Sequence, residues 1–221
     1  MISTLKQGEY FQPIDDVKYP IHIIGCGAIG STIATMLARM GVTELHIYDF
    51  DIVEMKNVCN QEYFDCQIGT KKLDALEETL HAINHDIKIH QHVDGWKEGI
   101  ITNGYIFLCV DNIDLRRQIV EANKYNKYCK AIFDFRMRLT DAQHYAADFK
   151  NFDYLLKTMN FTHEEAKEET PVSACGTDLN VITTVRTICS LGLSNFINFI
   201  KEGNLKKMIV IDLHEFIIDA F

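Results

Sequence analysis

Three glycines near the N-terminus have the spacing of a phosphate-binding turn. Gly25, Gly27 and Gly30 stand in the segment G-C-G-A-I-G, after an apolar run and before a run with helical periodicity. Glycine allows a tight turn in which backbone N–H groups approach phosphate oxygens. The first turn of the following helix, with Ala28 and Ile29, would supply positive potential beside the anion. The segment predicts a nucleotide site; the alternative is that these glycines serve only strand-to-helix packing.

An acidic residue follows at the place where such sites hold a ribose. Asp49 ends the second predicted strand, L-H-I-Y-D. A carboxylate in this position commonly accepts hydrogen bonds from ribose hydroxyls. Up to this point an NAD-dependent oxidoreductase and an ATP-binding protein fit equally well.

The elements that position these residues alternate between strand and helix. From residue 19 to residue 49 the pattern reads strand, turn, helix (28–40) and strand, which is a βαβ unit. A helix at 70–83, strands at 87–92 and 105–110, a helix at 112–126 and a strand at 131–135 continue it. We therefore predict an α/β fold, a Rossmann-like doubly wound, mostly parallel sheet with helices on both faces.

The pattern changes after residue 135. The segment R-L-T-D-A-Q-H-Y-A-A-D-F alternates as an exposed antiparallel strand does, and residues 152–169 are polar with helical spacing. A long apolar helix at 178–200 and two short strands then predict a C-terminal antiparallel extension. We treat 1–221 as a single domain, comprising an N-terminal segment (1–18), a nucleotide-binding core (19–135), a crossover segment (136–177) and the C-terminal helix and strands (178–221).

Composition excludes several classes of protein. Lys and Arg number 22 against 31 Asp and Glu, and the formal net charge of −9 argues against general binding to nucleic acid or anionic membranes. No apolar run is long enough to span a bilayer, and the N-terminus lacks the apolar core of a secretory signal. We therefore expect no membrane partner and a cytoplasmic location.

Cysteine and histidine usage does not predict a metal centre. The seven cysteines are scattered and form no C-x-x-C pair, so neither a disulfide framework nor structural zinc is expected. The nine histidines show no ligand spacing with cysteine or acidic partners.

Three further blocks identify a family resemblance. In order and spacing, D-F-D-I-V-E-M-K-N-V-C-N-Q, I-G-T-K-K and C-V-D-N-I-D-L-R resemble the core of the superfamily of ThiF, MoeB and the ubiquitin-activating enzymes, over residues 21 to about 120. This resemblance implies ATP- and Mg²⁺-dependent adenylylation of a carboxylate. The substrate it implies is a peptide or the C-terminus of a small ubiquitin-like or sulfur-carrier protein. Members usually pair two such domains, so a homodimer is expected.

The resemblance also implies roles for single residues. Asp49 would bind the ribose, and Asp51 belongs to the same nucleotide-binding block. Lys72 would contact the phosphates and act in catalysis, and Asp111 would hold Mg²⁺. Four further residues would line the ATP site or position Asp111: Asn57, Gln61, Asn112 and Arg116. For Arg116, a solvated helix surface is the alternative.

One departure concerns the phosphate charge. The family reads N-L-x-R-Q where this chain has N-V-C-N-Q, which places Asn60 at the arginine position. Asparagine donates a hydrogen bond but brings no cation. Either the reaction is slow or another cation substitutes, and our candidates are Arg136 and Arg138, in D-F-R-M-R at the end of a predicted strand. That motif also looks like a branch of short bacterial and phage ThiF-like proteins; a structural salt bridge is the alternative role for Arg136.

Cys175 is a candidate nucleophile. It stands in E-E-T-P-V-S-A-C-G-T-D, before the long C-terminal helix. A thiol near a helix N-terminus can have a lowered pKa, and the thiolate attacks an acyl adenylate to give a thioester. The alternative is a small residue packed at a helix start.

Two other functions stay open at this point. A nucleotide-binding interaction module would keep the fold and the ATP site without catalysis, and Asn60 is its main support. An oxidoreductase is disfavoured because it leaves no purpose for Asn57, Gln61, Lys72 and Asp111.

Overall fold

The computed structural model describes residues 3–100, 102–168, 172 and 179–221. The helices are α1 (Pro13–Asp16), α2 (Ala28–Arg39), α3 (Lys72–Ile83), α4 (Ile113–Asn123), α5 (Phe152–Lys157), α6 (His163–Glu168) and α7 (Ile182–Glu202), with short 3-10 helices η1 (Met55–Asn57) and η2 (Asp65–Gln67). The strands are β1 (Ile21–Ile24), β2 (Glu44–Tyr48), β3 (Lys88–His92), β4 (Gly104–Leu108), β5 (Cys129–Met137), β6 (Asp141–Asp148), β7 (Met208–Asp212) and β8 (Ile217–Ala220).

In the described residues the strands form one sheet in the order β3-β2-β1-β4-β5-β6-β7-β8. Strands β1 to β5 run parallel, and each later strand runs antiparallel to its neighbours. From β1 the chain first proceeds outward to β2 and β3, then returns to β4 on the other side of β1. Ligands of open α/β sheets bind beyond the carboxyl ends of strands at such a reversal.

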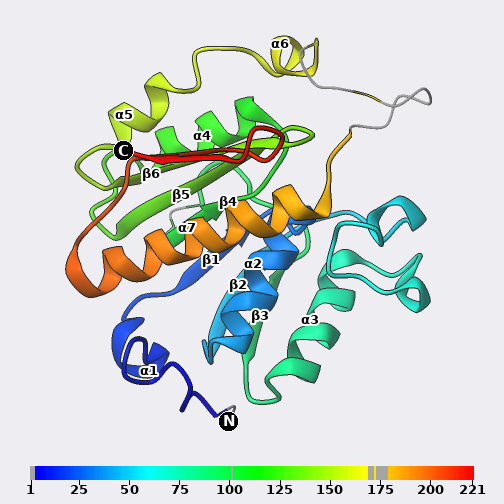
Figure 1. The fold of residues 1–221 in the computed structure, drawn as a ribbon. Helices are drawn as coiled ribbons and strands as arrows, with labels where there is room; N and C mark the ends of the chain where they lie inside the picture. The colour runs from blue at the N-terminus through cyan, green and yellow to red at the C-terminus, as the bar shows by residue number, and fades with distance from the viewer. Residues whose placement is uncertain (1–2, 101, 169–171, 173–178) are drawn as a thin grey trace.

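Helices cover both faces of the sheet, as Figure 1 shows. Apolar residues of α2, α3 and α7 pack with one face in the larger core cluster. Residues of α4 and α5 pack on the opposite face in a second cluster. The predicted fold class is confirmed. The short apolar runs form buried parallel strands, and the segments with helical periodicity between them form amphipathic helices. None of the helices in the described part of the chain is long and apolar enough to cross a membrane.

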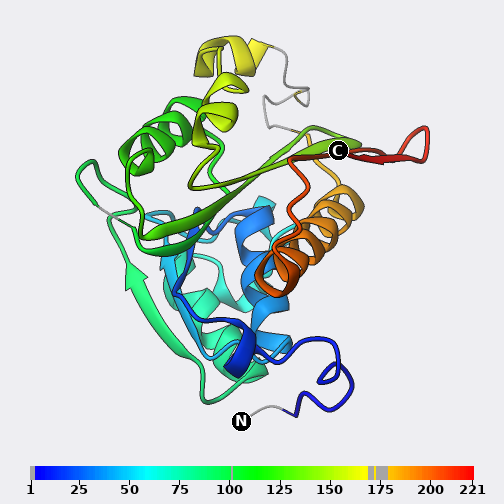
Figure 2. The ribbon, with the colours of Figure 1, turned by 90° about the vertical axis from the view of Figure 1, so that its left-hand side faces the viewer.

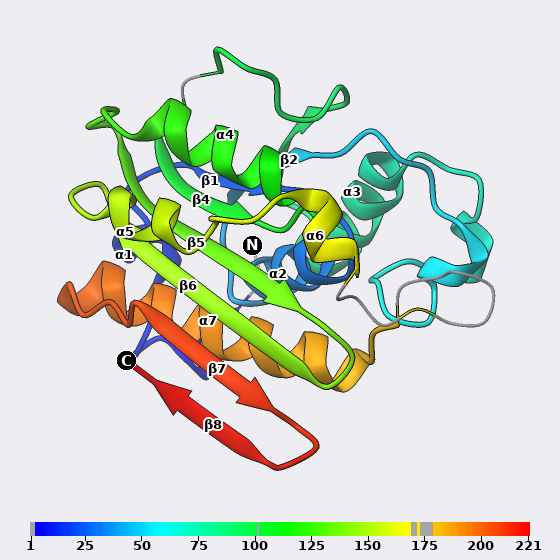
Figure 3. The same cartoon turned by 90° about the horizontal axis from the view of Figure 1, so that it is seen from above.

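The C-terminal strands extend the sheet, as expected. Strand β6, which lies in the segment predicted to cross over, pairs with β5 on one side and β7 on the other. It is antiparallel as predicted, but none of its positions is exposed, because α5 and α7 pack against it. The β7–β8 hairpin forms the far edge and projects from the body of the molecule, as Figures 2 and 3 show. All four positions of β8 are exposed.

One face of β1, β2 and β3 carries a group of aromatic rings. The register places His22 beside His46 and His46 beside His90, on the face opposite the core residues Leu45 and Ile47. Burial lowers the pKa of His22 to about 3 and of His46 to about 4, and neighbouring histidines add to the effect. Both rings are therefore uncharged at neutral pH.

Helix α7 lies against β5 at a glycine. A Cβ atom on Gly192 would stand 2.2 Å from Cε1 and 2.4 Å from Cζ of Phe135, whose ring is buried. The absence of a side chain at Gly192 therefore sets how closely α7 approaches the sheet.

We predict that Gly192→Ala lowers the thermal unfolding midpoint by several degrees. In a free helix this change would stabilise by about 1 kcal/mol, but here the new methyl group overlaps the buried Phe135 ring and must displace it. Scanning calorimetry measures the effect, with Ser190→Ala on the exposed side of α7 as the matched control. A stabilisation by Gly192→Ala equal to that of the control would contradict the packing described.

Candidate active site

The glycine turn links β1 to α2, and its glycines have different reasons to be glycine. Gly25 has φ +92°, and a Cβ there would lie 2.8 Å from the backbone nitrogen of Val110. A Cβ on Gly30 would lie 1.8 Å from the carbonyl oxygen of Gly25. A Cβ on Gly27 meets no atom within 4 Å. The fold therefore requires Gly25 and Gly30, whereas Gly27 borders open space.

Helix α2 presents an uncapped N-terminus at this turn. Its N-cap residue, Gly27, makes no side-chain hydrogen bond to the helix, and the first turn holds no acidic residue. Backbone N–H groups in the first turn of a helix, here those of Ala28, Ile29 and Gly30, lack partners within the helix. Such N–H groups, together with the helix dipole, are suited to bind an anion.

Asp49 joins the glycine turn to the end of β2. One carboxylate oxygen accepts a hydrogen bond of 2.7 Å from the N–H of Cys26, and the other accepts one of 2.8 Å from the N–H of Asp51. The hydroxyl of Tyr63 donates to the carbonyl of Cys26 at 2.6 Å. The turn is therefore held from two sides, and Asp49 keeps further acceptor positions on both oxygens.

Lys72 supplies a cation that pairs with Asp51, the neighbour of Asp49 in this network. It begins α3, and its Nζ lies 2.8 Å from Oδ2 of Asp51. The side chain of Lys72 is only 8% exposed, while that of Asp51 is 52% exposed. A bound phosphate could therefore replace the solvated carboxylate of Asp51 as the partner of Lys72. The lysine itself would lose little further hydration, because its side chain is already buried.

The segment around η1 holds amides with buried oxygens that lack partners. Asn57 accepts a hydrogen bond of 2.8 Å from the N–H of Glu54, which fixes the turn. Among the described residues, no partner is found for Oδ1 of Asn60 or Oε1 of Gln61. Buried polar atoms of this kind are costly unless a ligand or water satisfies them, so both residues are suited to contact a nucleotide.

Asp111 lies just beyond the carboxyl end of β4, and its carboxylate is exposed. The next residue, Asn112, caps α4 by accepting a hydrogen bond of 3.0 Å from the N–H of Leu115. Arg116 is buried rather than solvated: it donates to the carbonyls of Leu108 and Val110. Arg116 thus fixes the backbone that leads into Asp111.

Arg136 forms the salt bridge that was the alternative to a phosphate contact. Its Nε donates to Oδ2 of Asp134 at 2.7 Å, and its other nitrogens donate to the carbonyl and hydroxyl of Thr158. Asp134 is fully buried and also pairs with Arg116. Arg136 stacks over the ring of Tyr145 at 4.5 Å. These contacts hold Arg136 in the fold.

A different arginine, which sequence reasoning missed, lies near the N-terminal turns of α2. Arg186 on α7 pairs with Glu62. The backbone N–H of Glu62 donates to the hydroxyl of Ser31 in α2 at 3.1 Å. The side chain of Asn60 meets that of Asn180, just before α7. No motif marks Arg186, because its proximity depends on how α7 crosses α2.

Cys26 and Cys109 are poor nucleophiles. Burial raises the pKa of the Cys26 and Cys109 thiols above the ordinary value, so neither supplies a thiolate. Cys175 lies outside the described residues.

Comparisons with known proteins identify the family and the fold. The sequence pattern of the ThiF family matches residues 17–159. Ubiquitin-like modifier-activating enzyme 5 of Caenorhabditis elegans is 32% identical over 115 residues, which cover 45% of this chain and 27% of that enzyme.

Solved structures show the same fold. Escherichia coli MccB with ATP has a TM-score of 0.68 at 18% identity, covering 94% of this chain and 64% of MccB. MccB with MccA-N7isoASN has a TM-score of 0.71 at 17% identity, covering 94% of this chain and 65% of MccB. PaaA has a TM-score of 0.70 at 16% identity, covering 93% of this chain and 64% of PaaA.

The chain spans 27% of the length of the curated relative and 64–65% of the solved ones. The family pattern, in contrast, covers well over half of this chain. The chain therefore belongs to the ThiF family, within the superfamily of ThiF, MoeB and the ubiquitin-activating enzymes.

Proposed function

We propose that this chain binds ATP and adenylylates a carboxylate, with Mg²⁺ as cofactor. The observation that carries this proposal is the uncapped N-terminus of α2, where Gly27 borders open space. A connected network from Cys26 through Asp49 and Asp51 to Lys72 adjoins that site. This network supports the proposal that an anion site, a ribose acceptor and a phosphate cation lie together beyond the carboxyl ends of β1 and β2.

In the proposed reaction a carboxylate oxygen of the partner attacks the α-phosphorus of ATP. The bond from this phosphorus to the oxygen that bridges to the β-phosphate breaks, and the products are an acyl adenylate and pyrophosphate. The N–H groups of α2 bind phosphate oxygens, and Asp49 orients the ribose. Lys72 moves from Asp51 to the phosphates and offsets the charge that develops on the leaving group.

Asp111 would hold Mg²⁺. Its carboxylate is a hard oxygen ligand of the kind that this ion prefers. It is exposed, and among the described residues no hydrogen bond or ion pair engages its side chain. Arg116 holds the preceding backbone in place, so the carboxylate is both available and positioned. When bound, the ion would neutralise further phosphate charge.

The proposed partner is a peptide or the C-terminus of a ubiquitin-like or sulfur-carrier protein. Support comes from the relatives, which include a ubiquitin-like modifier-activating enzyme and MccB in complex with MccA-N7isoASN. We also propose that the chain acts in the cytoplasm as a homodimer, since the exposed edge strand β8 offers unpaired backbone groups to a second copy. Cys175 would accept the acyl group as a thioester in a later step.

Arg186 is our candidate for the cation that Asn60 does not supply. It reaches the first turns of α2 through Glu62 and Ser31, and its side chain is 44% exposed. Exchange of Glu62 for a phosphate oxygen would give the charge-assisted contact that an arginine at position 60 makes in the family. Arg136, which is fixed by Asp134 and Thr158, is less suited to this role.

A binding module without catalysis is the second candidate function. Asn60 favours it, because the side chain at the arginine position is neutral and engages Asn180. Such a protein would bind ATP through the same turn and release no pyrophosphate with any carboxylate.

The proposal predicts ATP–pyrophosphate exchange in the presence of Mg²⁺ and a peptide or carrier protein with a free C-terminus. Asp111→Ala should lower the exchange rate by about 100-fold or more, because it removes the ligand of the ion that neutralises the transition state. Glu121→Gln, an exposed change on α4, is the control. Tight ATP binding without exchange for a panel of candidate partners would favour the binding module instead.

The two glycine environments predict opposite phenotypes. Gly27→Ala should leave the unfolding midpoint unchanged but weaken ATP binding by about 10-fold or more, since its methyl group enters the open space beside the helix N-terminus. Gly30→Ala should lower the midpoint strongly, because its methyl group overlaps the Gly25 carbonyl. Calorimetry and ATP titration of both variants provide the comparison. If Gly27→Ala bound ATP as tightly as the parent chain, the proposal that the nucleotide binds at this turn would be wrong.

For Arg186 we predict that substitution by Gln slows exchange by about 10- to 100-fold, the effect of losing one charge-assisted hydrogen bond. Asn60→Arg in the same chain should restore part of the rate. Arg39→Gln at the opposite end of α2 is the control. If Arg186→Gln left the exchange rate unchanged, Arg186 would not be the cation that replaces the family arginine.

A further inference from the structure

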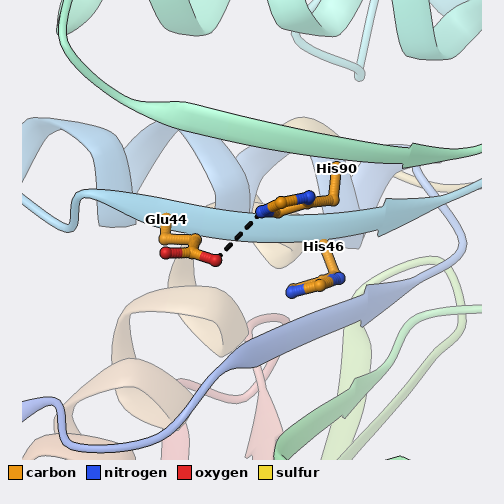
Figure 4. A group of neighbouring side chains, drawn as sticks. All are labelled: Glu44, His46 and His90. Carbon is orange, nitrogen blue, oxygen red and sulfur yellow. Dashed lines mark hydrogen bonds and ion pairs between the residues drawn. The ribbon is translucent and has the colours of Figure 1, made fainter.

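A cluster of potential metal ligands lies on the open face of β2 and β3, away from the nucleotide residues. Glu44, His46 and His90 project from the same face of these two strands, as Figure 4 shows. Glu44 and His46 are two residues apart on β2, and His90 is the register partner of His46 on β3. The cluster begins at the amino end of β2, whereas Asp49 follows its carboxyl end.

The three side chains bring their donor atoms close together. One carboxylate oxygen of Glu44 and one ring nitrogen of each histidine all lie within 4.8 Å of one another. Nε2 of His90 is 2.9 Å from a carboxylate oxygen of Glu44. Ligand atoms around a tetrahedral zinc ion lie about 3.3 Å apart. Glu44 and His90 are about half exposed, so rotation of their side chains can close the remaining gap.

His46 is already oriented by its neighbours. Its ring stacks between those of His22 and His90, with centroids 4.4 Å and 4.3 Å away. Nδ1 of His46 lies 3.3 Å from Nε2 of His92, which leaves the other nitrogen of His46 to face Glu44, as Figure 4 shows. Metal-binding histidines are usually held in this way, through the ring nitrogen that does not bind the ion.

We propose that Glu44, His46 and His90 bind one divalent transition-metal ion of the zinc class. Two imidazole nitrogens and one carboxylate oxygen are a donor set that suits Zn²⁺, Co²⁺ or Ni²⁺ and disfavours Mg²⁺ and Ca²⁺, which prefer oxygen ligands. Three protein ligands leave a fourth position for water or for a group from a partner. The ion would also link β3, which is the edge strand of the sheet, to β2.

The test is titration of the full, tag-free chain with Zn²⁺ by calorimetry and with Co²⁺ by absorption spectroscopy. We expect one ion per chain. His90→Ala and Glu44→Gln should each weaken binding by about 10-fold or more. The Co²⁺ spectrum should lack a thiolate charge-transfer band, because cysteine is absent from the ligand set. Mg²⁺ in excess should not displace the ion.

The matched control is His85→Ala. His85 also lies beside a carboxylate, Asp86, at 3.4 Å, but no third ligand completes that pair in the described residues. Its substitution should change Zn²⁺ affinity less than 2-fold. A loss of affinity in His85→Ala as large as in His90→Ala would overturn the proposal, and so would a thiolate band in the Co²⁺ spectrum that survives His90→Ala. Circular dichroism and the conservative Glu44→Gln variant separate loss of a ligand from loss of folding.

Discussion

The contact between Gly30 and the carbonyl of Gly25 is the constraint on which the rest of the structure depends. With a Cβ position only 1.8 Å from that oxygen, α2 lies against the turn more closely than any other residue would permit. This approach directs the N-terminus of α2 at the open space beside Gly27. It also places α2 between α3 and α7 in the larger core cluster, so the proposed anion site and the packing of three helices depend on one missing side chain.

A second constraint operates on the opposite side of the sheet, where Asp134 is buried with two arginines. A buried carboxylate is tolerated only when it is paired and hydrogen bonded. Arg116 brings the start of α4 and the end of β4 to this acid, and Arg136 brings the segment after α5. The backbone that carries Asp111 is therefore positioned by buried charges.

Much of the fold could be predicted from the sequence because its signals are local. The spacing of Gly25, Gly27 and Gly30 and the periodicity of the apolar runs each lie within one strand-turn-helix unit, and α2 begins at the predicted residue. The apolar character of the C-terminal stretch predicted a long helix there but not its direction across α2. Local patterns therefore predicted most of the elements, and the roles of the site residues stay predictions.

What could not be predicted depends on pairing between distant segments. Arg186 reaches Glu62 only because of the angle at which α7 packs, and Arg136 is engaged by Asp134 and Thr158 through the register of β5. His46 and His90 become neighbours through the register of two parallel strands separated by a helix. A one-residue shift in that register would place one of the histidines in the core, and no short motif records such a register.

The crossing of α7 over α2 also affects when the larger core can be completed during synthesis. The ribosome produces the glycine turn, Asp49 and Lys72 before it produces α7, the helix that covers the first turns of α2. A nascent chain that stops before α7 exposes the apolar face of α2 that Val185, Ile188 and Cys189 later help to cover. A chain truncated before α7 would therefore offer this apolar surface to chaperones and proteases.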